Sequence, residues 1–114
     1  MSPREIPPQQ WSSFLGNFGF HHFGWNVTLE EKSRGRGKPL TANHSFLEEL
    51  ATEGADGHQQ ITIVLGTPFH PYRTHVVSNP RRVRVAAGAQ DVLEIDSADG
   101  STVVVHLRRH DGGI

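Results

Sequence analysis

The sequence predicts an α+β domain in which one N-terminal amphipathic helix packs on a curved, mainly antiparallel sheet or half-barrel of six to seven strands. Three observations predict this fold class. Apolar residues recur at helical spacing near the N-terminus, and alternating apolar and polar residues fill most of the remaining chain. The segments between the expected strands are too short for the crossovers that parallel strands need. Because one short helix cannot cover so many strands, the sheet must bend over its own apolar face.

The expected helix begins at Pro7 or Pro8, since proline is tolerated in the first helical turn. Gly19 is its expected stop. A helix this short is marginal on its own, so we expect its apolar face to be buried against the sheet. That face has the spacing i, i+3, i+4 and i+7: Trp11, Phe14, Leu15 and Phe18. We expect these residues and Trp25 to belong to the core.

The expected strands show two-residue alternation or β-branched runs. They are residues 25–30, 60–65, 73–77, 82–86, 93–96 and 102–108. Residues 46–52 are ambiguous, because Leu47 and Leu50 have helical spacing, whereas the short length and the Asp-Gly hairpin signal that follows favour a strand. A second such signal, Asp99 and Gly100, predicts a tight turn between the last two strands.

Length and composition limit the class of protein. The chain has 114 residues, and we expect residues 1–114 to form a single domain with flexible ends at 1–6 and 109–114. The absence of cysteine excludes disulfides, Cys-based metal sites and a thiol nucleophile. A formal net charge of −1 provides no overall attraction to nucleic acid or anionic membranes. With no signal-peptide pattern and no apolar run near the roughly 20 residues that span a bilayer, we expect a cytoplasmic protein without membrane contact.

A set of residues between positions 4 and 108 follows a distinctive order, with a characteristic opening segment, a His-to-Pro spacing and a closing hairpin. They are Arg4, Glu5, Ile6, Pro7, Trp11, Phe14, Leu15, Gly24, Val27, Leu29, Glu30, Pro39, Leu40, Ile61, Ile63, Leu65, Gly66, His75, Pro80, Val83, Leu93, Glu94, Ile95, Asp99 and Gly100. This order resembles a small bacterial family known only as a domain of unknown function. Residues 46–51 depart from that family's pattern. The resemblance implies a single domain and no particular activity.

Histidine is frequent, with eight residues in the chain. A zinc site needs three or four ligands converging at about 2 Å, and neither His-Glu-x-x-His nor His-x-His occurs, so we expect no metal and no other cofactor. His75 stands out because it lies in a β-branched run. It either ties its strand to a neighbouring backbone carbonyl or belongs to a ligand-binding pocket together with Tyr72, Arg73, Arg82 and Arg84.

Basic residues form a second group of candidates. Arg34, Arg36 and Lys38 lie in a glycine-containing loop that could hold an anion with its backbone and side chains, although it lacks the P-loop spacing. The arginines at 81, 82 and 84 could contact a phosphate backbone. The alternative is that these charges keep loops soluble and protect an edge strand. Nucleic-acid binding is therefore the weaker hypothesis.

No catalytic residue is assigned, because no nucleophile motif occurs. Glu94 and Asp96 share a strand face and are expected to be solvated or paired with Arg82 and Arg84. Two phenylalanines beside His21 and His22, at positions 20 and 23, are candidates for an exposed aromatic contact. The leading hypothesis is a non-catalytic bacterial domain that binds a protein partner or forms a homo-oligomer. The alternatives are an anion or nucleic-acid binder, and a small-ligand or metal-binding half-barrel centred on His75, with enzyme activity as a corollary.

Overall fold

The computed structural model describes residues 4–33, 36–39, 45–54, 59–66, 73–87 and 90–109. In these ranges the chain forms one α-helix, one short 3-10 helix and nine strands, so the α+β prediction is confirmed with more strands than expected. In chain order they are β1 (Arg4–Ile6), η1 (Pro8–Gln10), α1 (Trp11–His21), β2 (Asn26–Ser33), β3 (Arg36–Pro39), β4 (Phe46–Glu53), β5 (Gln60–Gly66), β6 (Arg73–Ser78), β7 (Pro80–Ala86), β8 (Asp91–Ser97) and β9 (Thr102–Arg108).

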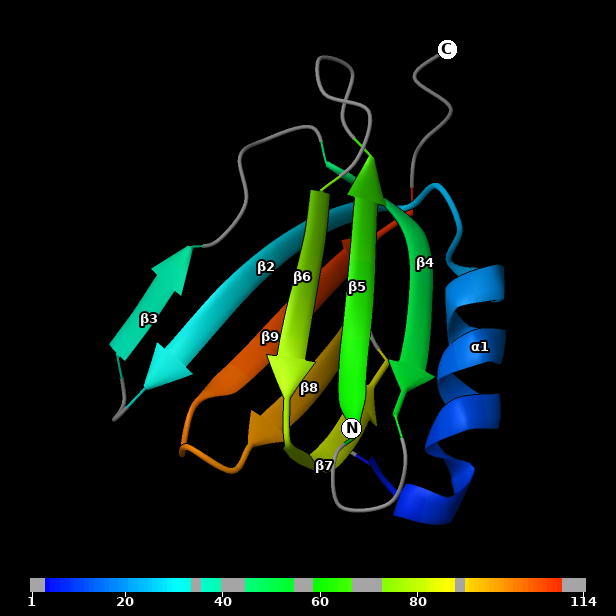
Figure 1. Ribbon diagram of the computed structural model, residues 1–114. Helices are drawn as coiled ribbons and strands as arrows, with labels where there is room; N and C mark the ends of the chain where they lie inside the picture. Colours follow the sequence, from blue (N-terminus) through cyan, green and yellow to red (C-terminus); the bar gives the residue numbers. More distant parts are fainter. Residues whose placement is uncertain are drawn as a thin grey trace, which may run out of the picture.

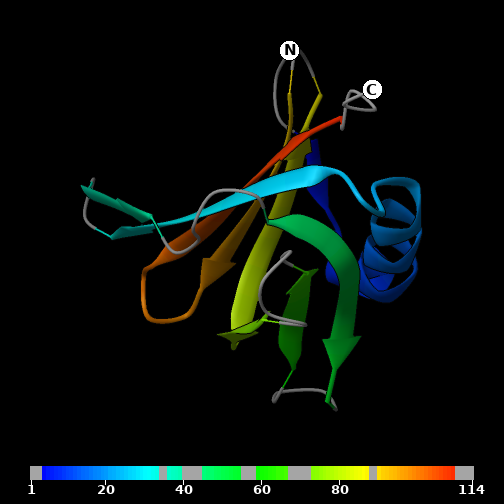
Figure 2. The same ribbon diagram turned by 90° about the horizontal axis from the view of Figure 1, so that it is seen from above.

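The strands form one open, antiparallel sheet with the order β1-β7-β8-β9-β2-β4-β5-β6, and β3 pairs with β2 beside this path. The sheet bends sharply between β2 and β4, where a single pair of residues, Asn26 and Phe46, is in register. One half then carries β1, β7, β8, β9 and β2, and the other carries β4, β5 and β6 (Figures 1 and 2). The two halves therefore meet at the start of β2 and β4, and these strands diverge beyond it.

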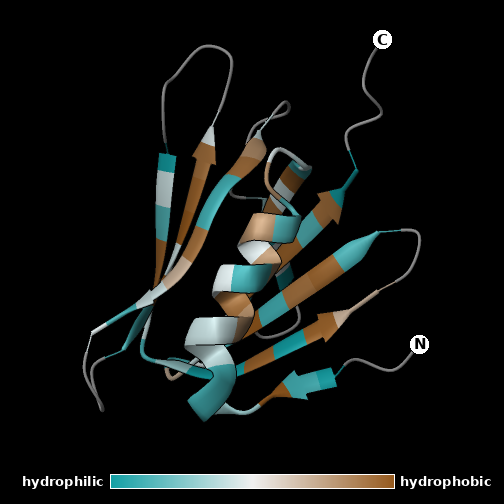
Figure 3. Ribbon diagram, turned by 90° about the vertical axis from the view of Figure 1, so that its right-hand side faces the viewer, coloured by the Kyte–Doolittle hydropathy of each residue, from teal (hydrophilic) through white to brown (hydrophobic). Residues whose placement is uncertain are grey.

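The core lies between the two halves and under α1. The helix packs chiefly on β4 and lies over the seam between the halves (Figure 3). It contributes Trp11, Leu15 and Phe18 to the core, while Phe14 and Trp25 pack against the core and are only partly buried. The inward faces of the strands supply the remaining core side chains: Ile6, Val27, Leu29, Leu47, Leu50, Ile61, Ile63, Leu65, Val77, Val83, Leu93, Ile95, Val103, Val105 and Leu107.

The helix differs from its prediction at both ends. The prolines start a 3-10 turn, η1, and α1 begins only at Trp11, whose indole Nε1 donates to the carbonyl oxygen of Ile6 at 2.9 Å. Gly19 is not the stop, because α1 continues to His21. Gly19 instead lies against the backbone of Leu50, where a Cβ atom would come within 3.2 Å of the Leu50 nitrogen. This glycine therefore serves close packing of the helix on β4.

The strand interpretation of residues 46–52 is confirmed, and a β-bulge explains the misleading pattern. The register of β4 against β5 shifts between Leu47 and Glu49. The extra residue changes the alternation, so Leu47 and Leu50 both face the core although they are three positions apart. The predicted turn before β9 is also present, with Gly100 at a φ of +91°.

Two strands were not expected. Residues 4–6, which we expected to be flexible, form β1 and pair with β7. Residues 36–39, expected as part of a loop, form β3 and pair with β2. β1 buries only Ile6, and β3 buries nothing. Neither segment therefore shows the apolar alternation on which the prediction of strands depends.

Candidate functional site

A groove of about 600 Å³ runs between the C-terminal half of α1 and strand β4. Gly16 and Gly19, three positions apart on the helix, line it and leave no side chain there. Leu50 lies beneath Gly19, and Phe20 and Phe23 line the groove near the end of the helix. The groove thus exists because the helix lacks side chains where it approaches the strand. We call the surface lined by these residues the α1–β4 groove: Gly16, Gly19, Phe20, Phe23, Glu48, Glu49 and Leu50.

The two phenylalanines of the groove are unusually exposed. Phe20 is 79% exposed and Phe23 is 61% exposed, and both rank among the exposed large apolar residues of the described ranges. The predicted aromatic contact site is thus exposed as expected, although Phe20 belongs to α1, which continues past the expected stop at Gly19. Glu48 and Glu49 make the β4 side of the groove acidic. An apolar surface with an acidic border is therefore open to solvent.

The turn that carries Phe23 is attached to β4 by two backbone hydrogen bonds. The backbone nitrogen of Gly24 donates to the carbonyl oxygen of Leu47 at 2.9 Å, and the nitrogen of Leu47 donates to the carbonyl oxygen of Trp25 at 3.0 Å. Gly24 has a φ of +82°, a value that glycine adopts without strain. The aromatic side chains therefore project from a fixed support.

His22 anchors the same turn from inside the protein. Its ring stacks on Phe18 at a centroid distance of 3.9 Å and meets Trp25 edge-on at 4.4 Å. Nδ1 lies 2.7 Å from the carbonyl oxygen of Phe18, which only accepts, so Nδ1 carries a proton. Nε2 lies 2.8 Å from Oδ2 of Asp91, and this contact needs one proton, on the ring or on the carboxyl group. His22 thereby connects α1 to the first residue of β8.

The residues predicted to form a pocket with His75 are distributed over two strands. Arg73 and His75 lie on β6, whereas Arg82 and Arg84 lie on β7, and Tyr72 is outside the described residues. His75 is half-buried, and its ring forms no hydrogen bond or ion pair with another described residue. The expected bond to a backbone carbonyl is therefore not found there. The two β7 arginines line a hollow that includes neither β6 residue.

The second predicted anion site also lies apart from β7. Arg36 and Lys38 lie on β3, are exposed and pair in register with β2 residues. Arg34 is outside the described residues. In the strand order, β8, β9 and β2 separate β7 from β3. The basic residues thus belong to two separate regions of the sheet.

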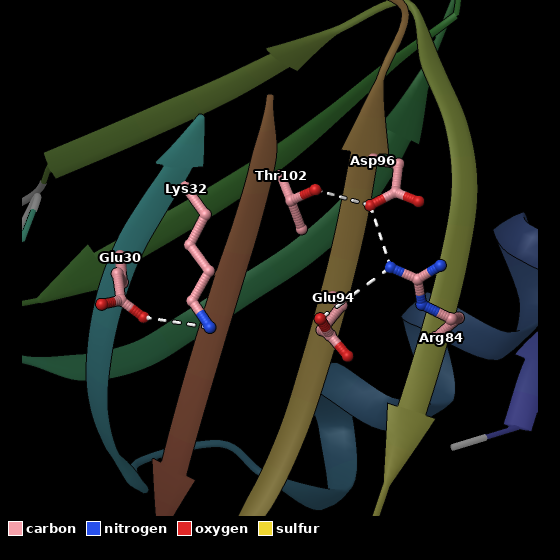
Figure 4. Close-up of polar contacts among 6 residues, drawn as sticks. All are labelled: Glu30, Lys32, Arg84, Glu94, Asp96 and Thr102. Carbon is pink, nitrogen blue, oxygen red and sulfur yellow. Dashed lines mark hydrogen bonds and ion pairs between the residues drawn. The ribbon is translucent and has the colours of Figure 1, made fainter. Parts of the chain in front are cut away.

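Charges of both signs cover the outer face of the sheet near β7 and β8 (Figure 4). Arg84 Nη2 donates to Asp96 Oδ1 at 3.0 Å and lies 3.8 Å from Glu94 Oε2. Thr102 Oγ1 donates to the same Asp96 oxygen at 2.7 Å. The predicted pairing of Glu94 and Asp96 is therefore confirmed for Arg84, while Arg82 forms no ion pair with any described residue.

Further along this face, Lys32 Nζ lies 3.9 Å from Glu30 Oε1 (Figure 4). His106 Nε2 lies 3.6 Å from the same glutamate oxygen. Cations and carboxylates thus alternate across the outer face. Across the ranges that the structure covers, no three histidine or acidic side chains gather in a way that would hold a metal ion.

No protein-family model and no curated protein matches the sequence. The fold is similar to the crystal structure of the Bacillus subtilis YojF protein, with a TM-score of 0.54 and 7% sequence identity over 96% of each chain. At this identity the similarity concerns the fold alone. None of the helices in the described part of the chain has the length and apolar character needed to cross a lipid bilayer.

Proposed function

We propose that this chain is a non-catalytic protein-interaction domain and that the α1–β4 groove is its contact surface. The exposure of Phe20 and Phe23 beside this groove is the observation that supports the proposal. Two large aromatic side chains in water are unfavourable by the hydrophobic effect, and aromatic residues are enriched in protein interfaces. The bacterial, uncharacterised family that the sequence resembles is compatible with such a role and assigns no other.

The partner we propose is a second copy of the chain, related by a two-fold axis. In such an interface each copy inserts its two phenylalanines into the groove of the other. Residues in and beside the groove have complementary chemistry, because His21, next to Phe20 in the chain, is exposed and Glu49 is exposed on the β4 side. A two-fold axis can bring the imidazole of one copy to the carboxylate of its partner.

The buried area predicts a weak dimer. If each phenylalanine side chain offers about 200 Å², the exposed fractions of Phe20 and Phe23 amount to about 280 Å² per copy. Two copies would bury about 560 Å² of aromatic surface, and groove walls of about equal area would bring the total to about 1,100 Å², below the roughly 1,200 Å² at which stable complexes begin. The dimer should therefore form only at high protein concentration.

The β6 edge of the sheet, which lies at the opposite end of the strand order from β1, is a competing route to self-association. Strand β6 pairs only with β5 among the described residues, and its Val76 is 44% exposed. However, this edge carries the exposed Arg73, and a charge on an edge strand discourages edge-to-edge pairing. The groove is therefore the favoured surface.

Size-exclusion chromatography with light scattering, over a wide range of protein concentration, tests this proposal. The wild type should move from the mass of one chain toward that of two, and the double variant Phe20→Ser, Phe23→Ser should stay a monomer. Val76→Ser is the matched control, because it removes an exposed apolar side chain from the β6 edge. A wild type that stays monomeric at every concentration would refute the proposal, as would a dimer that Val76→Ser abolishes and the double variant keeps.

A further inference from the structure

An open hollow of about 500 Å³ lies on the outer face of the sheet, at β7, β8 and the turn that leads into β9. Three arginines line one side of it: Arg81, Arg82 and Arg84. The other lining side chains are three hydroxyl groups and the carboxylate that pairs with Arg84: Ser97, Ser101, Thr102 and Asp96. The hollow is separate from the α1–β4 groove and shares no residue with it.

A β-bulge brings the three arginines together. Pro80 is opposite Ser97 and Arg82 is opposite Asp96, so Arg81 is the extra residue of the bulge. Proline cannot donate a backbone hydrogen bond and is commonly found at bulges. In regular alternation Arg81 would point to the opposite face from Arg82, but both are exposed and line the same hollow. The segment from Pro80 thus concentrates positive charge on one face.

Two of these arginines, Arg81 and Arg82, are available to bind an anionic ligand. Arg84 is engaged by Asp96 at 3.0 Å and by Glu94 at 3.8 Å. Arg81 and Arg82 form no ion pair with any residue that the structure describes. A guanidinium group has five N–H donors in a planar fork that matches the oxygens of phosphate. The two exposed guanidinium groups therefore suit a phosphate group held between them.

Glu5 is in register with Arg84 on the neighbouring strand, and the other carboxylate near this hollow is Asp99. Its Oδ1 accepts hydrogen bonds from the backbone nitrogen of Ser101 at 2.8 Å and from the Ser101 hydroxyl at 2.6 Å. Asp99 is therefore occupied by its own turn. Because Glu94 and Asp96 pair with Arg84 alone among the described cations, Arg81 and Arg82 keep this part of the hollow positively charged.

The hydroxyl groups that line the hollow offer hydrogen-bond acceptors, whereas the arginines offer donors. The hydroxyl of Ser97 donates to the carbonyl oxygen of Ser78 at 2.7 Å, and that of Thr102 donates to Asp96 at 2.7 Å. The Ser101 hydroxyl donates to Asp99. Each hydroxyl proton is thus committed to the protein, so the oxygens remain as acceptors. Acceptors beside a phosphate site suit a ligand that has hydroxyl donors of its own.

We propose that this hollow binds a small phosphorylated sugar, with the phosphate on Arg81 and Arg82 and the sugar hydroxyls on the serine and threonine oxygens. A volume of this size lies within the range of small-molecule sites. A nucleic-acid backbone fits less well, because Glu30, Glu94 and Asp96 interrupt the cations across the outer face (Figure 4). The proposal is independent of the dimer through the α1–β4 groove.

Isothermal titration calorimetry with ribose 5-phosphate tests the proposal, with ribose and inorganic phosphate as partial ligands. The variants are Arg81→Gln and Arg82→Gln, each of which removes one charge from the exposed surface. Arg73→Gln is the matched control, since Arg73 is equally exposed and lies on β6, outside the hollow. Because Arg73, Arg81 and Arg82 are exposed, the variants should keep the circular dichroism spectrum and melting temperature of the wild type.

We expect saturable binding of ribose 5-phosphate, weaker binding of phosphate, and none of ribose. Arg81→Gln and Arg82→Gln should each weaken binding about tenfold or more, as for the loss of a charge-assisted contact, and Arg73→Gln should leave it unchanged. The absence of saturable binding would overturn the proposal. So would equal weakening by all three variants, which would indicate diffuse attraction, or binding of a single-stranded oligonucleotide without binding of ribose 5-phosphate.

Discussion

Replacing Leu15 by alanine tests the position of α1 as part of the core. Leu15 is 0% exposed and belongs to the same cluster as the inward residues of both sheet halves. Leu15→Ala removes three carbon atoms, each worth about 0.8 kcal/mol of transfer free energy. The cavity left behind adds a term of about 24 cal/mol per Å³. Because β4 and the seam hold the helix, little collapse is possible, and we expect a loss of about 3–4 kcal/mol in the free energy of unfolding.

Urea unfolding measures this loss, with the fluorescence of Trp11 and Trp25 as the probe. For a denaturant slope of about 1.5 kcal/mol per molar, the midpoint should fall by about 2 M. Phe14→Ala should cost less, because Phe14 is only partly buried. The exposed Ser12 is the control, and Ser12→Ala should stay within about 0.5 kcal/mol of the wild type. A loss below about 1 kcal/mol for Leu15→Ala would show that the helix is not packed as described.

Three further perturbations address other contacts. Asp91→Ala leaves Nε2 of His22 without its partner and should cost about 1–3 kcal/mol of unfolding free energy. Asp91→Asn should cost less, because its amide can donate to that nitrogen. Equal losses for the two variants in urea unfolding would contradict the hydrogen-bond assignment. Gly100→Ala forces a residue with a Cβ atom to a φ of +91° and should lower the unfolding free energy by about 1–2 kcal/mol, and a neutral effect on the melting temperature would argue against this turn. The hydrogen bonds from Ser101 lower the pKa of Asp99 below its ordinary value of 3.8. The ionised carboxylate therefore stabilises the turn above pH 3.8, and its contribution disappears as the pH falls through the lowered pKa. The difference in melting temperature between wild type and Asp99→Ala should shrink toward pH 3. A difference that stays constant with pH would refute the linkage.

Much of the fold could be predicted because alternation and helical spacing report directly on burial. Each of the seven expected strands is present, and the helix buries Trp11, Leu15 and Phe18 as expected. Strands β1 and β3 could not be predicted, because an edge strand with few inward side chains has no apolar pattern. Gly19 does not end the helix as predicted. A glycine is needed there because the helix contacts Leu50 of β4, and the sequence alone does not show a contact between residues so far apart.

The candidate sites were predictable only in part. The chemistry of Phe20, Phe23 and the β7 arginines is visible in the sequence, and their exposure was expected. The groove and the hollow were not predictable, because both depend on tertiary details. Two glycines on one helix face must meet a particular strand to open the groove, and a one-residue bulge must turn Arg81 toward its neighbours to form the hollow.

The pairing of the strands also determines the order in which the molecule can assemble. Strands β4, β5 and β6 form one meander of neighbouring hairpins, and β7, β8 and β9 form another. The N-terminal segment joins them, because β1 pairs with β7, and β2 pairs along its length with β9 and meets β4 at one point. The pairing of β2 with β9 can thus be completed only after the residues near 108 have left the ribosome, whereas β1 can pair with β7 and α1 can pack on β4 earlier. Closing such long loops is slow, so the rate of folding should depend on the docking of the N-terminal segment onto two preformed meanders.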